Sequence, residues 1–251
     1  MKATFLNHQQ PLLTMLFSVK TAEEARRHFA KGLEEGAEAF CIQTCALELE
    51  ARNEENFRKL FNCAEGKPIY VTNYRGGVNE GTSDEQIAEG LLMLARSGAT
   101  LCDVMGDMFD RQPGEMTDSP EAVVKQMELI RKLKEAGAEV LMSSHVCRFI
   151  SAEEVLDIAL RQQSRGADIV KIVTGAETIE EQLENLRITA LLKKELKVPF
   201  LFLSGGQCNI HRRIGPELGC CMYLCSLDDS VDPKPIQPML RKVKAIRDNF
   251  R

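Results

Sequence analysis

The chain has 251 residues, of which 44% are hydrophobic and 27% charged, and its formal net charge is −5. This length suits one or two domains and includes single α/β barrels of about 250 residues, while the apolar fraction excludes intrinsic disorder and fibrous repeats. The acidic balance argues against a general nucleic-acid binder, because no excess of Lys and Arg is present to neutralise phosphates.

Short apolar runs alternate with amphipathic stretches along the whole chain. The predicted strands lie at residues 12–19, 39–45, 68–73, 100–105, 139–144, 168–173, 199–204 and 221–225. The predicted helices lie at residues 22–35, 53–64, 84–97, 120–136, 152–165, 179–196, 210–218 and 235–249. Eight consecutive strand–helix units predict one α/β domain over residues 1–251, a (β/α)8 TIM barrel. The alternative is an open doubly wound sheet, but no Gly-x-Gly-x-x-Gly follows the first strand, which weakens its dinucleotide-binding version.

Capping signals support the predicted helix boundaries. Glycine ends four helices and is followed each time by alanine, at residues 36–37, 98–99, 137–138 and 166–167. Glycine in this position supplies the left-handed conformation that stops a helix. A hydroxyl residue before first-turn glutamates begins three helices, at Thr21, Ser151 and Thr178.

The chain contains nine cysteines. None of its apolar stretches approaches the ~18 residues that a membrane span needs, and no signal cleavage site follows the apolar residues 11–19. We therefore expect a cytoplasmic protein with reduced thiols. Cys41/Cys45 and Cys221/Cys225 have a Cys-x3-Cys spacing that could suggest zinc. Both pairs fall in predicted strands, where four residues span about 13 Å, so we expect buried apolar cysteines and no metal site.

Lys171 is the strongest candidate for a reactive group. It lies inside the apolar strand 168–173 and has no acidic neighbour in the sequence. Barrel strands are covered on both faces, so burial is expected to lower the pKa of this lysine and leave a neutral amine that can attack a carbonyl. The alternative is a lysine at the barrel rim, or one paired with Asp168 or a glutamate.

Three further side chains are expected at the same mouth, because barrel enzymes place their sites at the C-terminal ends of the strands. His145 ends the preceding strand, about 4.8 Å away, and suits proton transfer beside an imine. Arg75 and Arg213 are candidate contacts for a carboxylate. A capping or core histidine and two surface arginines are the alternatives.

Three motifs resemble type I 3-dehydroquinate dehydratases in their order and spacing. They are Ser-Ser-His at 143–145, Gly-Ala-Asp-Ile-Val-Lys-Ile at 166–172 and Ser-Gly-Gly-Gln-Cys-Asn-Ile-His-Arg-Arg at 204–213. The resemblance runs over the whole barrel and is strongest from about residue 140 to about residue 219. Class I aldolases also carry an imine-forming lysine on the sixth strand, so Lys171 alone would not distinguish the two families.

The resemblance implies a role for each matching residue. Lys171 corresponds to the imine-forming lysine and His145 to the general acid/base. Glu80 corresponds to the glutamate that orients the histidine, if one residue is inserted after Arg75. Arg75 and Arg213 correspond to the two arginines that hold the substrate carboxylate.

The sequence departs from the family at several positions that contact the substrate. Gln43 and Cys45 replace the Glu-x-Arg pair that contacts the ring hydroxyls, and Asp103 and Met105 replace Asp-x-Glu. The glutamine of the loop that closes over the substrate falls at or near Pro235. The expected substrate-binding residues are Arg75, Arg213, Gln43, Cys45, Ser204 and Gln237. These changes suggest a divergent member, since altered hydroxyl contacts change substrate discrimination.

The resemblance implies a hydro-lyase that converts 3-dehydroquinate to 3-dehydroshikimate and water in the shikimate pathway, without metal or cofactor. The alternatives are a class I aldolase-like lyase acting on another keto acid, and a non-catalytic barrel that binds a small carboxylate. The expected partner is a small-molecule carboxylate substrate, with neither nucleic acid nor membrane. A homodimer is one assembly that the sequence allows.

Overall fold

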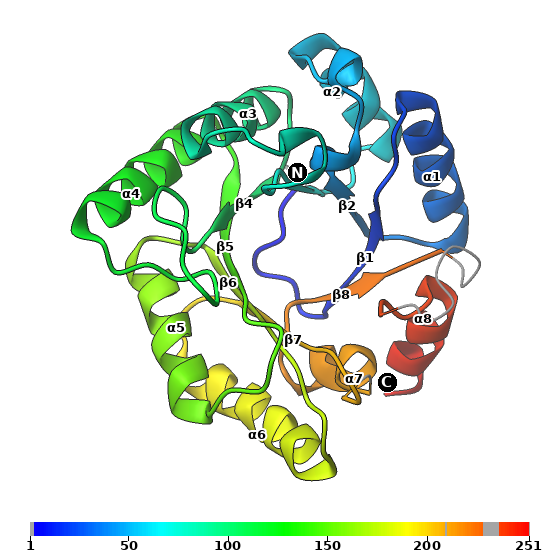
Figure 1. Ribbon diagram of the computed structural model, residues 1–251. Helices are drawn as coiled ribbons and strands as arrows, with labels where there is room; N and C mark the ends of the chain where they lie inside the picture. The colour runs from blue at the N-terminus through cyan, green and yellow to red at the C-terminus, as the bar shows by residue number, and fades with distance from the viewer. Residues whose placement is uncertain (1–2, 209, 228–235, 251) are drawn as a thin grey trace.

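Eight parallel strands surrounded by eight helices form the protein in a computed structural model, which describes residues 3–208, 210–227 and 236–250 (Figure 1). The strands are β1 Leu12–Phe17, β2 Ala39–Gln43, β3 Ile69–Thr72, β4 Leu101–Met105, β5 Glu139–His145, β6 Ile169–Thr174, β7 Phe200–Ser204 and β8 Met222–Cys225. The helices are α1 Ala22–Glu35, α2 Glu54–Phe61, α3 Asp84–Arg96, α4 Pro120–Glu135, α5 Ala152–Ser164, α6 Ile179–Glu195, α7 His211–Leu218 and α8 Leu240–Asn249. Short 3-10 turns are η1 Thr44–Ala46, η2 Leu49–Ala51, η3 Asn62–Ala64 and η4 Gly77–Asn79.

The strands follow one another around a nearly closed ring. Each strand from β1 to β6 pairs in parallel with the next, and β8 pairs in parallel with β1. Between β7 and β8 the Cys221 N–H donates to the Phe200 carbonyl over 2.9 Å. The pairing of β8 with β1 excludes the open doubly wound sheet and confirms the predicted (β/α)8 barrel. In the part of the chain that is described, no helix is long and apolar enough to cross a membrane.

The predicted caps are present at the helix ends. Thr21 and Ser151 each form a capping box with the glutamate three residues later, and Thr178 caps α6. Gly36 ends α1 with φ 88°, a left-handed conformation that a side chain would strain. These local interactions explain why the helix boundaries are readable in the sequence.

The second strand is shorter than predicted. It ends at Gln43, and Cys45 lies in η1 instead of in the strand. The chain turns there because the Thr44 hydroxyl donates to the Thr72 carbonyl of β3 over 2.8 Å. The expectation that Cys41 and Cys45 share one strand is therefore wrong.

The N-terminal segment covers the end of the barrel where the strands begin. In Figure 1 the blue N-terminal segment runs inside the ring of strands before it enters β1. Phe5 is buried against Tyr70 with ring centroids 6.4 Å apart, and its N–H donates to Glu139 at the start of β5 over 2.8 Å. The open mouth is therefore at the C-terminal ends of the strands, where barrel enzymes place their sites.

Candidate active site

Lys171 of β6 points into the barrel, where two tyrosines and an aspartate surround its amine. Nζ donates to the Tyr74 hydroxyl over 2.7 Å and to the Tyr70 hydroxyl over 3.0 Å, and lies 3.1 Å from Asp103 Oδ2. The side chain is buried. The sequence shows no acid beside Lys171, but the barrel places Asp103 of β4 against it, so the lysine is ion-paired. The sequence led us to expect a lysine without an acidic partner, and the tertiary structure corrects this expectation.

Asp103 is buried and accepts hydrogen bonds at both carboxylate oxygens. Ser143 donates to Oδ1 over 2.5 Å, while Tyr70 and Tyr74 both donate to Oδ2. Burial alone would raise the pKa of this carboxyl group, but the positive charge of Lys171, that of His145 when protonated and these hydrogen bonds hold it below its ordinary value. Asp103 is therefore a carboxylate at neutral pH.

His145 ends β5 beside the same cavity, and the carboxylate that holds it belongs to Glu115. Glu115 Oε2 lies 2.6 Å from His145 Nδ1 and also accepts the His145 backbone N–H over 3.0 Å. The expected pairing with Glu80 is wrong in this structure, because Glu80 follows η4 and lines a separate cavity with Asn79 and Thr82. The ring of Tyr74 meets the His145 ring edge-on, with centroids 5.1 Å apart.

Arg75 is near the site, but its guanidinium is already engaged. It donates to both oxygens of Asp84 over 2.8 and 2.6 Å, and to the carboxylate and carbonyl of Asp107 over 2.8 and 3.1 Å. Burial alone would lower the pKa of Arg75, yet these carboxylates raise it. Because the two acids neutralise it, Arg75 is not placed to hold a substrate carboxylate as expected; it joins the loops after β3 and β4.

The arginine at the Lys171 cavity is Arg212 and not Arg213. Arg212 is buried in the first turn of α7, where Nε donates to the Ser204 carbonyl over 2.9 Å and Nη1 to Gln237 Oε1 over 3.2 Å. Burial lowers its pKa to about 10, so it stays charged at neutral pH. Arg213 is half-buried on the next position of the helix and is not among the residues that form this cavity.

The cavity above Lys171 has a volume of about 460 Å³ and is lined by both polar and apolar residues. Its polar lining consists of Gln43, Thr72, Tyr70, Tyr74, His145, Lys171, Arg212 and Gln237. Its apolar lining consists of Leu16, Cys41, Val173, Leu203, Leu224 and Ile236. The arrangement can bind a small carboxylate at Arg212 while its carbonyl faces Lys171.

Of the other predicted substrate-binding residues, two line the cavity, one lies behind it and one lies outside it. Gln43 and Gln237 line it. Ser204 lies behind it, with its hydroxyl accepting from Asn185 over 2.9 Å and its carbonyl holding Arg212. Cys45 lies outside it, in η1. Pro235 lies outside the described residues.

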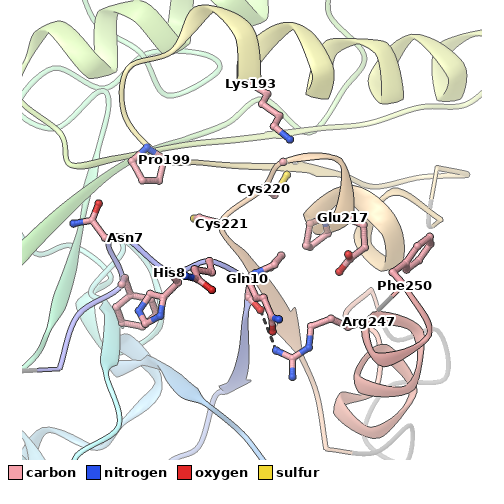
Figure 2. A pocket seen from close by; sticks show the side chains of 15 residues that line it. Asn7, His8, Gln10, Lys193, Pro199, Glu217, Cys220, Cys221, Arg247 and Phe250 are labelled. Carbon is pink, nitrogen blue, oxygen red and sulfur yellow. Dashed lines mark hydrogen bonds between the residues drawn. The ribbon is translucent and has the colours of Figure 1, made fainter. Parts of the chain in front are cut away.

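A second cavity, of about 560 Å³, lies at the opposite end of the barrel, where β1, β7 and β8 begin (Figure 2). Two of its charged groups, Arg247 and Glu217, already have partners within the chain. Arg247 donates to Glu38 and to the Pro11 carbonyl, and Glu217 accepts the Tyr223 hydroxyl over 2.7 Å. The mouth with Lys171 and His145 therefore offers the reactive groups.

Residues 20–248 match the family model described as type I 3-dehydroquinase. The chain belongs to this family. The match confirms the predicted resemblance and favours a dehydratase over an aldolase. Enzymes of the family are dehydratases that act through a Schiff base, so the predicted class, a hydro-lyase of the shikimate pathway, is confirmed as well.

Solved structures of the same family share the fold across almost the whole chain. The 3-dehydroquinate dehydratase from Geobacillus kaustophilus has a TM-score of 0.81 at 17% identity, over 96% of this chain and 91% of that one. The type I enzyme from Clostridium difficile, with covalently modified comenic acid, has a TM-score of 0.80 at 18% identity, over 97% of this chain and 93% of that one. The 3-dehydroquinate dehydratase from Enterococcus faecalis has a TM-score of 0.78 at 19% identity, over 99% of each chain. No curated protein matches the sequence.

Three site residues were not singled out by the sequence motifs. Glu115 lies in the irregular loop after β4, with φ 53°, where no periodicity predicts a side-chain direction. Tyr70 looks like an ordinary apolar strand residue. Arg212 had no such signal either, because the apolar residues Ile210 and Leu218 of this segment are exposed, whereas the buried residues of α7 are His211, Arg212, Gly215 and Pro216.

Proposed function

We propose that this protein dehydrates 3-dehydroquinate to 3-dehydroshikimate through an imine on Lys171. The observation that carries the proposal is the buried Lys171 amine at the C-terminal mouth of the barrel, in one cavity with His145 and Arg212. The amine attacks the substrate ketone, and the carbonyl oxygen leaves as water. The resulting iminium withdraws electrons from the neighbouring carbon and acidifies its C–H bond.

His145 carries the proton between carbon and oxygen. Glu115 holds Nδ1, so Nε2 is the nitrogen left to act in the cavity. Nε2 removes the C–H proton, and the same proton is delivered to the hydroxyl on the next carbon as the C–O bond breaks. Water then hydrolyses the unsaturated imine, releases the enone and restores the Lys171 amine.

Arg212 is the proposed anchor for the substrate carboxylate, with Gln43 and Gln237 as hydroxyl contacts. A guanidinium binds a carboxylate through two parallel hydrogen bonds, and a partly desolvated one does so more strongly than an exposed one. Gln237 is itself held by Arg212, so the two residues act as one unit. This assignment replaces the arginine pair expected from the sequence.

Borohydride trapping tests the proposal. The protein is incubated with 3-dehydroquinate and sodium borohydride, its intact mass is measured, and enone absorbance is followed in parallel without borohydride. We expect one reduced adduct, located at Lys171 by peptide mapping, together with new absorbance. Lys171→Ala should lose both, while Lys134→Ala, a matched change of an exposed lysine paired with Asp168, should lose neither. No adduct on the wild-type protein with 3-dehydroquinate or another keto acid would overturn the imine.

A second candidate is dehydration or cleavage of a keto acid with fewer hydroxyl groups. Apolar lining residues such as Leu16, Leu203 and Ile236 favour it, because these side chains offer no hydrogen-bond partner to a ring hydroxyl. An adduct with 3-dehydroquinate but no enone, alongside an adduct and turnover with a less hydroxylated keto acid, would favour this candidate.

The cellular setting and assembly remain part of the proposal. All nine cysteines are free thiols, which supports a reducing compartment such as the cytoplasm. We propose a small-molecule enzyme that needs neither nucleic acid nor membrane. The homodimer stays a prediction, which the mass measured by analytical ultracentrifugation would test.

A further inference from the structure

Two tyrosine hydroxyls bridge Lys171 and Asp103 in parallel. Tyr74 accepts a hydrogen bond from Nζ over 2.7 Å and donates its own to Asp103 Oδ2 over 2.5 Å. Tyr70 makes the same pair of contacts, to the same nitrogen and the same oxygen. Each hydroxyl is therefore acceptor to the amine and donor to the carboxylate, the arrangement through which a proton can pass from one to the other.

The proposed function leaves one requirement unassigned. Lys171 lies 3.1 Å from a buried carboxylate and must lose a proton before its nitrogen can attack a ketone. Glu115 already holds one nitrogen of His145, and the proposed function uses the other on the substrate C–H. Asp103 is the base that lies nearest to the lysine nitrogen, so it is placed to accept the lysine proton.

We propose that Tyr74 relays this proton from Lys171 to Asp103 and back, an inference that rests on the proposed imine function. In the forward step an N–H bond of the ammonium breaks and its proton moves to the Tyr74 oxygen, while the Tyr74 proton moves to Asp103 Oδ2. The products are a neutral amine, a neutral Asp103 and an unchanged tyrosine. After attack on the ketone, Asp103 returns its proton through Tyr74 as the carbonyl oxygen leaves as water. The iminium then faces the Asp103 carboxylate, so charge is conserved.

Tyr74 and Tyr70 differ in their access to the substrate. Tyr74 is partly exposed, lines the Lys171 cavity and the adjoining cavity of about 500 Å³, and packs against His145. Tyr70 also lines the Lys171 cavity, but it has no exposed surface and Phe5 packs against its ring. Tyr74 can therefore reach the oxygen that leaves the substrate, whereas Tyr70 fixes the position of Asp103.

The other groups around Lys171 suit this division of roles. Cys41 of β2 is buried, and burial raises its thiol pKa, so it stays neutral. Burial and the neighbouring Asp103 carboxylate raise the pKa of Tyr74 far above neutrality, so Tyr74 transfers protons as a hydroxyl and not as a phenolate. His145, with Glu115 behind it, and Arg212 line the same cavity and complete the charged surroundings of the amine.

The test compares Tyr74→Phe with the wild-type chain by the rate of borohydride-trapped adduct, with 3-dehydroquinate and with 4-oxopentanoate as ketones, between pH 6 and 10. Removing a general acid–base group costs about 10²-fold or more. We expect such a loss at pH 7, partial recovery at high pH, and little change in the concentration of ketone that gives half the maximal rate. Tyr223→Phe, a matched change at the opposite end of the barrel, should leave the rate unchanged.

Two outcomes are kept apart by this design. A wild-type chain without adduct on either ketone overturns the imine function itself. A wild-type adduct that Tyr74→Phe forms at the same rate and with the same pH profile overturns the relay alone. Should Tyr74→Phe fail to fold, difluorotyrosine placed at position 74 retains the hydroxyl with a lower pKa. The relay then requires a changed rate or pH profile, and an unchanged one overturns it.

Discussion

One carboxylate oxygen of Glu115 holds His145 at two points, the ring nitrogen Nδ1 at 2.6 Å and the backbone N–H at 3.0 Å. The two contacts fix both the position of the strand end and the orientation of the imidazole. A loop residue thereby performs the orienting role that the sequence assigned to Glu80, and the difference can be measured.

Glu115→Gln should lower kcat about ten- to a hundredfold with a small effect on KM. The amide cannot match the charge of the carboxylate that orients the imidazole and stabilises its protonated form, so proton transfer by Nε2 slows. Glu80→Gln is the matched control and should keep wild-type kcat. Steady-state enone formation gives both constants. A larger loss in Glu80→Gln than in Glu115→Gln would contradict the assignment.

Arg212→Gln should raise KM for the keto acid, whereas Arg213→Gln should not. A hydrogen bond between charged groups is worth about 1.5–3 kcal/mol, which corresponds to roughly ten- to a hundredfold in binding. The neighbouring position serves as the control for a change on the same helix. Initial rates over a range of substrate concentrations distinguish the two variants. Equal KM values in both would remove Arg212 as the carboxylate anchor.

Arg75→Met should destabilise the fold more than it changes catalysis. It leaves Asp107, which is fully buried, and Asp84 without their cation, a loss of about 3 kcal/mol. Arg131→Met removes an exposed pair on α4 and should cost less than about 1 kcal/mol. Urea unfolding followed by circular dichroism measures both. Comparable losses in the two variants would show that the Arg75 cluster contributes no more than a surface pair.

The same cluster predicts a pH dependence of stability. Burial alone would raise the pKa of Asp84, but the hydrogen bonds from Arg75 and the Phe109 N–H lower it below the ordinary value of 3.8. A lowered folded-state pKa stabilises the protein above the ordinary value, and the stabilisation is lost as pH falls through the lowered value. The free energy of unfolding of the wild type should decrease as the pH is lowered below about 4. The free energy of unfolding of Arg75→Met should decrease less over the same pH range. Parallel pH curves would contradict this.

Lys171→Met should destabilise the protein at pH 7, even though it replaces a buried charge by an apolar side chain. Lys171 is the largest of the influences that hold the pKa of Asp103 below 3.8 against burial, so its removal should raise that pKa. An unpaired buried carboxylate costs about 3–5 kcal/mol. The deficit relative to the wild type should shrink towards pH 4, as Asp103 becomes protonated in the variant. Urea unfolding at pH 7 and pH 4 tests this, and an equal deficit at both would contradict it.

The sequence by itself determined the barrel and the placement of Lys171 and His145. Alternating strands and helices, hydroxyl caps such as Thr21 and C-terminal glycines such as Gly36 are local signals, and each acts within a few residues of where it is read. His145 and Lys171 lie on consecutive strands, β5 and β6, which pair in parallel, so both residues lie towards the same end of the barrel.

Only the tertiary structure decided which side chains meet at that mouth. Asp103 of β4 reaches Lys171 of β6 past the intervening strand β5, and Glu115 reaches His145 from an irregular loop. Arg212 and Arg213 are adjacent and alike in type, so the rotation of α7 against the barrel selects between them. Side-chain partners across a barrel depend on strand tilt, loop path and helix rotation, none of which local sequence patterns encode.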